Sequence, residues 1–169
     1  MGKPCRQVPA LEIKLGARVE IRRARGEDAG LLTDIAHAAK RHWGYPESWI
    51  CAWAVALTVT NDYIDAHPTF VAVANADIVG FCALILEPDG AQLDHLWVLP
   101  KAMGGGVGRA LFVQAETAAR AAGATYLRIV GDPHAEGFYQ RMGASVYGWE
   151  PAPMDRRERF LPLLKKVLE

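Results

Sequence analysis

The sequence lacks most features of a membrane protein or a nucleic-acid-binding protein. It has no apolar stretch long enough to span a bilayer and no secretory signal. Lys and Arg together number 19, as do Asp and Glu, and no long basic run occurs. We therefore expect neither nucleic acid nor an anionic membrane as the main partner. Met1-Gly2 lacks the Ser or Thr that a myristoylation site requires.

Cysteine is scarce and shows no metal-ligand pattern. Cys5, Cys51 and Cys82 form an odd, widely spaced set, which is typical of reduced thiols in a cytoplasmic protein. We therefore expect a cytoplasmic location and no bound metal. Internal repeats and low-complexity segments are also missing, and a hydrophobic content of 51% over 169 residues predicts one domain with a proper core.

The first half of the chain predicts helices followed by antiparallel strands. Residues 1–17 show no hydrophobic period, so we expect an irregular N-terminal extension before a single domain at residues 18–169. The expected elements are a strand at 18–24, helices at 26–41 and 46–59, a connection at 60–67 with room for a short helix, and strands at 70–74, 78–86 and 91–99. Three antiparallel strands in a row argue against a doubly wound fold.

The second half begins after a glycine-rich loop. The expected elements are a helix ending at Gly123, a strand at 126–130, a helix from 132 to 143, a strand at 144–149 and a short closing amphipathic helix at 156–168. Pro162 interrupts the last helix, because proline lacks the N–H that a helix needs.

The stretch Leu93–Leu111, LDHLWVLPKAMGGGVGRAL, joins a strand to a helix through four glycines in five positions. Glycine costs backbone entropy when it is fixed, so such a cluster indicates a need for bare backbone. Consecutive N–H groups at a helix N-terminus can turn toward one anion, which the helix dipole also favours. The pattern therefore predicts a pyrophosphate site at Gly104, Gly105, Gly106 and Gly108.

Three other interpretations of these glycines have to be weighed. A P-loop would need Lys and then Ser or Thr after the last glycine, where Arg109 and Ala110 stand. A dinucleotide (Rossmann) site is weakened by Leu111 at the place of the third small residue, although Asp132 lies at a suitable distance for a ribose contact. The third interpretation is a glycine-rich turn without a ligand.

The order of strand, Pro100, loop, Gly106-Val107-Gly108 and helix resembles the acetyl-CoA-binding motif of the GNAT N-acetyltransferase superfamily. That motif is written Gln/Arg-x-x-Gly-x-Gly/Ala, and Met103 departs from it at the first position. A second block, Asp132–Gly143, is similar to the family's Asn-x-x-Ala-x-x-Phe/Leu-Tyr block and the glycine turn after it, with Asp in place of Asn. The resemblance covers roughly residues 19–149.

The resemblance implies a fold and a co-substrate. The fold would be the α/β (mixed α+β) GNAT fold, with a central, mostly antiparallel mixed sheet of six to seven strands flanked by helices and a splayed parallel strand pair at the acetyl-CoA site. Acetyl-CoA would be the co-substrate, and no metal is implied. The residues assigned to the coenzyme, by the resemblance or by charge, are Trp97, Val98, Met103, Gly104, Gly105, Gly106, Val107, Gly108, Arg109, Asp132, Ala135 and Tyr139.

Acetyl transfer to an amine also needs proton transfer. Neutralising a lysine-like amine at pH 7 costs about 4 to 5 kcal/mol, so a base or a water relay is useful. Asp94 stands where the family often places its base, and a structural hydrogen-bonding role is the alternative. His95 has the better unperturbed pKa, but strand alternation points it to the opposite face unless a bulge intervenes. The resemblance makes Tyr139 the general acid that protonates the coenzyme sulfur.

The acceptor site is predicted from an unusual composition. Residues 42–49, HWGYPESW, place aromatic side chains around a helix break, which is also compatible with core packing. In the family, the first two helices and their connection form a wall of the acceptor site. The acceptor-site candidates are His42, Trp43, Tyr45, Glu47, Trp49 and Gln92.

Two functions from different classes follow from the resemblance. The first is an acetyl-CoA-dependent N-acetyltransferase that acts by direct transfer in a ternary complex on a primary amine of a small molecule or peptide. The second is a non-catalytic acyl-CoA-binding module of the same fold, for which Met103 and the absence of a glutamate at position 92 leave room. Dimers are common in the family, so a homodimer is one expected assembly.

Overall fold

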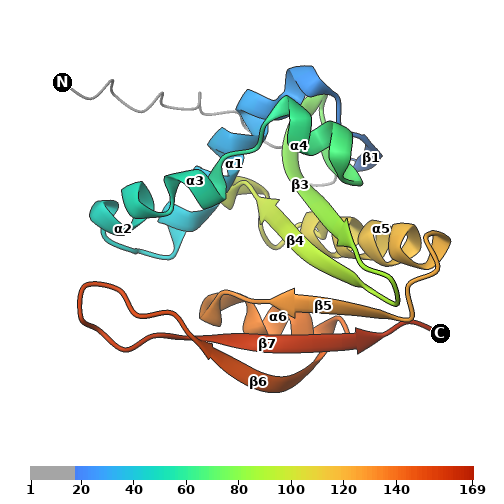
Figure 1. The fold of residues 1–169 in the computed structure, drawn as a ribbon. Coiled ribbons are helices and arrows are strands. Elements are labelled where there is room, and N and C mark those ends of the chain that lie inside the picture. Colours follow the sequence, from blue (N-terminus) through green and yellow to red (C-terminus); the bar gives the residue numbers. More distant parts are fainter. Residues whose placement is uncertain (1–17) are drawn as a thin grey trace.

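The computed structural model describes residues 18–169, so the predicted extension at residues 1–17, with Cys5, lies outside the described residues. The described chain forms a seven-stranded sheet with helices on both faces, in the strand order β1-β2-β3-β4-β5-β7-β6 (Figure 1). The strands are β1 (Glu20–Arg23), β2 (Thr69–Ala74), β3 (Asp77–Leu86), β4 (Ala91–Val98), β5 (Tyr126–Val130), β6 (Ser145–Pro151) and β7 (Phe160–Val167). The helices are α1 (Ala29–His42), α2 (Glu47–Ala52), α3 (Ala54–Leu57), α4 (Asn61–Ala66), α5 (Val107–Ala121) and α6 (Glu136–Arg141), with 3-10 turns at Gly26–Asp28, Pro100–Ala102 and Pro133–Ala135.

The predicted fold class is confirmed, but one predicted element is wrong. Neighbouring strands are antiparallel except for β4 and β5, which are parallel. The helix predicted at residues 156–168 is instead β7, which lies between β5 and β6. Pro162 explains the difference, because it has no N–H to donate within a helix. In β7 it pairs with Trp149, and its carbonyl accepts a hydrogen bond from the Gly131 N–H at 2.9 Å.

The second predicted helix is divided into two. Helices α2 and α3 meet at Trp53, which ends the first and caps the second. The connection after them contains the short helix α4, whose N-cap Thr60 accepts a hydrogen bond from the Tyr63 N–H at 3.1 Å. Trp53 is therefore fixed at the junction of α2 and α3, and Tyr63 on the neighbouring helix α4.

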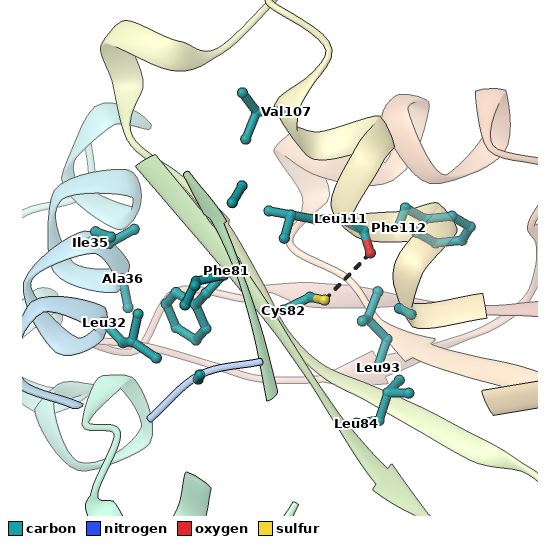
Figure 2. Packing of buried hydrophobic residues seen from close by; sticks show 14 of the residues in the cluster. Leu32, Ile35, Ala36, Phe81, Cys82, Leu84, Leu93, Val107, Leu111 and Phe112 are labelled. Carbon is teal, nitrogen blue, oxygen red and sulfur yellow. Dashed lines mark hydrogen bonds between the residues drawn. The ribbon is translucent and has the colours of Figure 1, made fainter. Parts of the chain in front are cut away.

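Strand β3 runs through the middle of the core. Its successive side chains point to opposite faces: Phe81 lies toward Leu32 and Ile35 of α1, and Cys82 lies toward α5 (Figure 2). The Cys82 thiol donates to the Leu111 carbonyl oxygen at 3.4 Å. The side chains of these residues are fully buried: Leu32, Ile35, Phe81, Cys82 and Leu111. Helices α1 and α5 are thereby fixed to opposite faces of one strand.

The sheet opens between β4 and β5. The two strands pair only near their starts, where Ala91–Leu93 lies beside Leu127–Ile129, and then diverge (Figure 1). Beyond Leu93, the edge of β4 that faces β5 has no strand partner among residues 18–169. The predicted splayed parallel pair is therefore present, and it leaves main-chain groups of β4 open to a ligand.

Gly80 allows β3, β4 and α5 to approach closely. A Cβ atom here would lie 2.8 Å from the Trp97 carbonyl oxygen and 3.1 Å from Leu111 Cδ1. Because the backbone oxygen cannot move away cheaply, Gly80→Ala should lower the free energy of unfolding by about 1 to 3 kcal/mol, as measured by urea denaturation. Gly30→Ala is the matched control, since a Cβ there meets nothing within 4 Å. Wild-type stability of Gly80→Ala would contradict this packing.

Candidate active site

Two cavities meet where β4 and β5 diverge. The first, of about 610 Å³, is called the glycine-loop cavity, and its walls include Val98, Gly106, Gly108, Phe138 and Tyr139. The second, of about 490 Å³, is called the aromatic cavity, and its walls include Lys40, Trp53, Tyr63, His95 and Arg159. The residues that line both cavities are Asp94, Trp97, Val130 and Asp132. Molecules bound in the two cavities could therefore meet at the opening between the strands.

The glycine loop has a backbone that other residues would not adopt easily. Gly104 and Gly106 have φ values of 79° and 83°, in the left-handed region. A Cβ at Gly108 would lie 3.4 Å from the Phe138 ring and 3.8 Å from Val98, which is ordinary van der Waals contact, so only Gly104 and Gly106 require glycine for their conformation. Helix α5, of 15 residues, begins directly after Gly106. The loop therefore presents bare backbone at the positive end of a helix dipole, which suits an anion.

The residues predicted to hold the coenzyme line the glycine-loop cavity, except for Gly105 and Val107. Val107 is buried in the core (Figure 2), so only its main chain is available to a ligand. Arg109 and Arg141 also line the cavity, and Arg141 was not predicted. Both side chains add positive charge to the wall of this cavity.

Asp94 is held at the opening by its neighbours. It is the extra residue of a β-bulge, because Leu93 and His95 on either side of it pair with consecutive residues of β3. The Tyr63 hydroxyl donates to Asp94 Oδ2 at 2.6 Å, and the Gln92 Nε2 group donates to Oδ1 at 3.3 Å. The carboxylate is 25% exposed. It is thus oriented, yet reachable from both cavities.

His95 lies beside Asp94, because the bulge brings both side chains to the aromatic cavity. Its Nε2 lies 3.5 Å from Asp94 Oδ2, and the Trp97 indole N–H donates to its Nδ1 at 3.0 Å. Burial lowers the pKa of His95, and the charge of Asp94 opposes this only in part. The imidazole is therefore neutral at neutral pH, and the lone pair of its Nδ1 already accepts the hydrogen bond from Trp97. Asp94, in contrast, is partly exposed and lines both cavities.

Tyr139 reaches the glycine-loop cavity from α6. Its ring is buried among Phe112 and Phe138, with ring centroids 6.2 and 5.3 Å away. Burial, together with the nearby charge of Asp132, raises the pKa of Tyr139 well above its ordinary value. The phenol therefore keeps its proton at neutral pH, as a proton donor must.

Asp132 collects donors from several segments of the chain. Lys40 Nζ lies 2.5 Å from Oδ2 and Arg159 Nη2 3.5 Å from it, while the Tyr45 hydroxyl and the His134 N–H each donate to Oδ1 at 3.0 Å. Burial disfavours the ionised form, but the charge and hydrogen bond of Lys40 outweigh it and hold the pKa of Asp132 below its ordinary value. Asp132 is therefore a fixed anion whose oxygens are engaged by protein groups.

Three acceptor-site candidates, at the end of α1 and the start of α2, lie outside the aromatic cavity. His42 is exposed, with its ring 5.1 Å from that of Trp43. Trp43 lines the glycine-loop cavity and stacks on His134 at 5.1 Å. Glu47 forms a surface ion pair with Arg41, at 2.6 Å. None of the three lines the aromatic cavity.

The remaining acceptor-site candidates surround the aromatic cavity without lining it. Tyr45 and Trp49 pack around Trp53, with ring centroids 5.1 and 5.8 Å away. Gln92 donates to Asp94, as described above. These residues therefore support the walls of the cavity.

The cavity residues that sequence reasoning missed are Lys40, Trp53, Tyr63 and Arg159. Lys40 could have been identified from the sequence, because it lies one turn after the buried Ala36 on the apolar face of α1, where a charged side chain needs a partner. Arg159 has no such signal, since its segment was predicted to be part of a helix.

Among residues 18–169, no group of three or more His, Cys, Asp or Glu side chains could hold a metal ion. Over the same part of the chain, every helix is too short or too polar to cross a membrane.

The family model described as an acetyltransferase (GNAT) domain matches residues 65–143. The match includes the glycine loop, Asp94, Asp132 and Tyr139. No curated protein matches the chain significantly.

Several solved structures share the fold. A GCN5-related N-acetyltransferase from Rhodopseudomonas palustris has a TM-score of 0.72 and 23% identity, covering 95% of this chain and 100% of its own. The PaiA N-acetyltransferase from Thermoplasma acidophilum, in complex with coenzyme A, has a TM-score of 0.68 and 21% identity, covering 89% and 99%. A ribosomal-protein-alanine N-acetyltransferase from Brucella melitensis has a TM-score of 0.65 and 21% identity, covering 88% and 99%. At these identities the likeness establishes the fold.

Proposed function

We propose that this chain is an acetyltransferase of the GNAT superfamily, as the family match over residues 65–143 and the shared fold support, and that it transfers the acetyl group of acetyl-CoA to a primary amine of a small molecule or peptide. The transfer is direct, with both substrates bound at once. The observation that supports this most is the junction of the two cavities, where Asp94 is within reach of both and Tyr139 faces the glycine-loop side. A donor in one cavity and an acceptor in the other would meet at that junction.

The glycine-loop cavity has the chemistry that coenzyme A needs. Gly106 and Gly108 offer bare backbone at the start of α5 for the diphosphate, and Arg109 and Arg141 supply cations. The open edge of β4 at Val98 offers main-chain groups to the amides of the pantetheine arm. The thioester of the bound coenzyme supplies the activated acetyl group.

Asp94 takes up a proton from the acceptor. An alkylammonium group has to become neutral before its nitrogen can act as a nucleophile, at a cost of about 4 to 5 kcal/mol at pH 7. Asp94 is held by Tyr63 and Gln92 at the opening between the cavities, so its free lone pairs can accept the proton there. A well-placed general base contributes about 10² to 10⁴-fold in rate.

Tyr139 donates a proton to the departing sulfur. The amine nitrogen forms a bond to the acetyl carbon while the carbon–sulfur bond breaks. The ammonium loses two protons overall: one leaves to solvent through Asp94, and the other balances the proton that Tyr139 gives to the sulfur. The products are an N-acetyl amide and coenzyme A.

Tyr63 positions Asp94 in this scheme. Burial and the hydrogen bond to Asp94 raise the pKa of Tyr63, so the hydroxyl stays protonated and donates at 2.6 Å. Tyr63→Phe removes a hydrogen bond to a charged group, so we expect kcat/KM to fall by about tenfold. Affinity for coenzyme A should not change, because Tyr63 is not part of the glycine-loop cavity. A wild-type kcat/KM would remove Tyr63 from the scheme.

Release of the coenzyme A thiol from acetyl-CoA, followed across a panel of amines, tests the proposed function. Turnover that depends on an added amine supports it, and the rate without amine is the control for hydrolysis. Binding of acetyl-CoA without turnover of any amine would contradict it and favour a non-catalytic acyl-CoA-binding module.

A further inference from the structure

The aromatic cavity carries positive charge that the proposed reaction does not use. Lys40 and Arg159 line it, and the carboxylates on its walls, among the described residues, are Asp94 and Asp132. Lys40 Nζ and Arg159 Nη2 both approach Asp132, at 2.5 and 3.5 Å. Burial lowers the pKa of Lys40, and the charge and hydrogen bond of Asp132 oppose this. When Lys40 and Arg159 are both protonated, two cations share one carboxylate and this end of the cavity has a net positive charge, while Asp94 supplies a negative charge elsewhere on the wall.

The guanidinium of Arg159 has hydrogen-bonding capacity to spare. It offers five N–H donors in a fixed fork. The distance from Arg159 Nη2 to the Asp132 carboxylate, 3.5 Å, is longer than a good hydrogen bond. Asp132 already accepts hydrogen bonds from Lys40 and Tyr45. The Arg159 side chain is 11% exposed, and its Nε has no hydrogen-bond partner within the part of the chain that the structure describes. Such a fork is well suited to a second carboxylate.

Two aromatic rings, Trp53 in the wall of this cavity and Tyr45 behind it, already hold the protein's own cations. Lys40 Nζ lies 4.4 Å from the centroid of the Trp53 ring and 4.9 Å from that of Tyr45. Arg159 Cζ lies 5.0 and 5.4 Å from the same two centroids. A ligand with a second positive charge would therefore find these ring faces occupied and two cations beside them. The cavity disfavours polycationic acceptors.

We propose that the acceptor is an amine that also bears a carboxylate, an amino-acid-like molecule whose amine lies at Asp94 and whose carboxylate binds Arg159. The inference rests on the proposed function and names its substrate class. A zwitterion matches the charges of the cavity, because its ammonium meets the Asp94 carboxylate and its carboxylate meets the cationic end.

The loop between β6 and β7 brings Arg159 to the cavity. It reaches toward α2 (Figure 1), where the Trp49 indole N–H donates to the Asp155 carboxylate. Asp155 and Arg156 turn the loop with left-handed φ values of 47° and 62°. The anchored loop therefore places the guanidinium opposite α1, and Trp49, one of the predicted acceptor-site residues, acts through it.

Matched acceptor pairs test the proposal. Each pair is an amino acid and its carboxamide, taken from α- and ω-amino acids of increasing length, so that only the negative charge differs. We expect kcat/KM with acetyl-CoA to be at least about tenfold higher for the acid than for the amide. The amide has the less basic amine and therefore the larger neutral fraction, so amine reactivity would not explain a preference for the acid. Equal values across the pairs, or a preference for amides, would overturn the proposal.

Variants of the loop show whether Arg159 carries the preference. Arg159→Gln should remove it by raising KM for the acids with little effect on the amides, and Arg159→Lys should retain part of it, because the charge stays but the fork is lost. Arg157→Gln, an exposed position on the same loop, is the matched control and should keep the full preference. An equal loss for acids and amides in Arg159→Gln would contradict carboxylate binding by Arg159.

Calorimetry with the same pairs separates this proposal from the proposed function. If the acids bind to the complex of the protein with coenzyme A, the amides do not bind, and the Arg159→Gln protein binds no acid, the carboxylate site stands even without turnover. If amides and simple alkylamines are acetylated with the same kcat/KM as the acids, the proposed function stands and the carboxylate site does not. If no acid binds or is acetylated, the carboxylate site is overturned.

Discussion

Replacing Tyr139 by phenylalanine should lower kcat by about 100-fold or more, the usual contribution of a general acid. The variant keeps the ring that packs against Phe112 and Phe138 and loses only the hydroxyl. Affinity for acetyl-CoA should therefore stay within about twofold of wild type. Steady-state turnover and calorimetry on the same preparation measure the two quantities.

Tyr147→Phe is the matched control, because Tyr147 lies on β6 and is 55% exposed, away from both cavities. It should turn over at the wild-type rate. Unchanged turnover in Tyr139→Phe would remove Tyr139 from the mechanism. A large loss of acetyl-CoA affinity would assign the hydroxyl to binding instead of proton transfer.

Replacing Asp94 by asparagine should lower kcat/KM at neutral pH by about 100-fold or more. Asparagine keeps the shape and can still accept a hydrogen bond from Tyr63, but it cannot take up a proton. The deficit should shrink as the pH rises toward the pKa of the acceptor amine, because a growing fraction of the acceptor is then already neutral. The pH–rate profiles of the variant and the wild type, recorded under the same conditions, measure this effect.

Asp65→Asn makes the same chemical change on the exposed surface of α4 and should leave the profile unchanged. If Asp94→Asn shared the wild-type pH–rate profile, Asp94 would not be the base. A loss that stayed constant at every pH would indicate that the carboxylate only positions other groups.

Local patterns were enough to predict the centre of this fold. The strand that ends near Leu99, the glycines up to Gly108 and the helix after them are adjacent in the chain, so their spacing specifies a strand–loop–helix unit without knowledge of the rest. The hairpin turn at Asn75 and Ala76 is similar: φ values of 52° and 68° belong to the short turn that its composition predicted.

Features that depend on pairing between distant strands could not be predicted from the sequence. Strict alternation separates Asp94 from His95, and only the register with β3 shows that a bulge brings both to one cavity. Strand β7 was predicted as a helix because its apolar residues fit either period. Pro162 argues against a helix, and pairing with both β5 and β6 makes the segment a strand.

The acceptor side was the least predictable for the same reason. Lys40 and Arg159 are far apart in the sequence and come together only around Asp132. The aromatic residues at 42–49 did indicate this region, but Tyr45 and Trp49 stand behind Trp53 and do not line the cavity. Composition showed where a wall would form, and packing decided which side chains face inward.

Isothermal titration calorimetry with acetyl-CoA tests the central claim most directly, because everything else depends on the glycine loop holding the diphosphate of coenzyme A. We expect saturable binding in a one-to-one ratio, competition by coenzyme A but not by NAD, and at least about tenfold weaker binding in Gly106→Val, where a β-branched residue would have to adopt a φ of 83°. Folded wild-type protein that gave no binding heat with acetyl-CoA at several temperatures, or that bound NAD without competition from coenzyme A, would contradict the account.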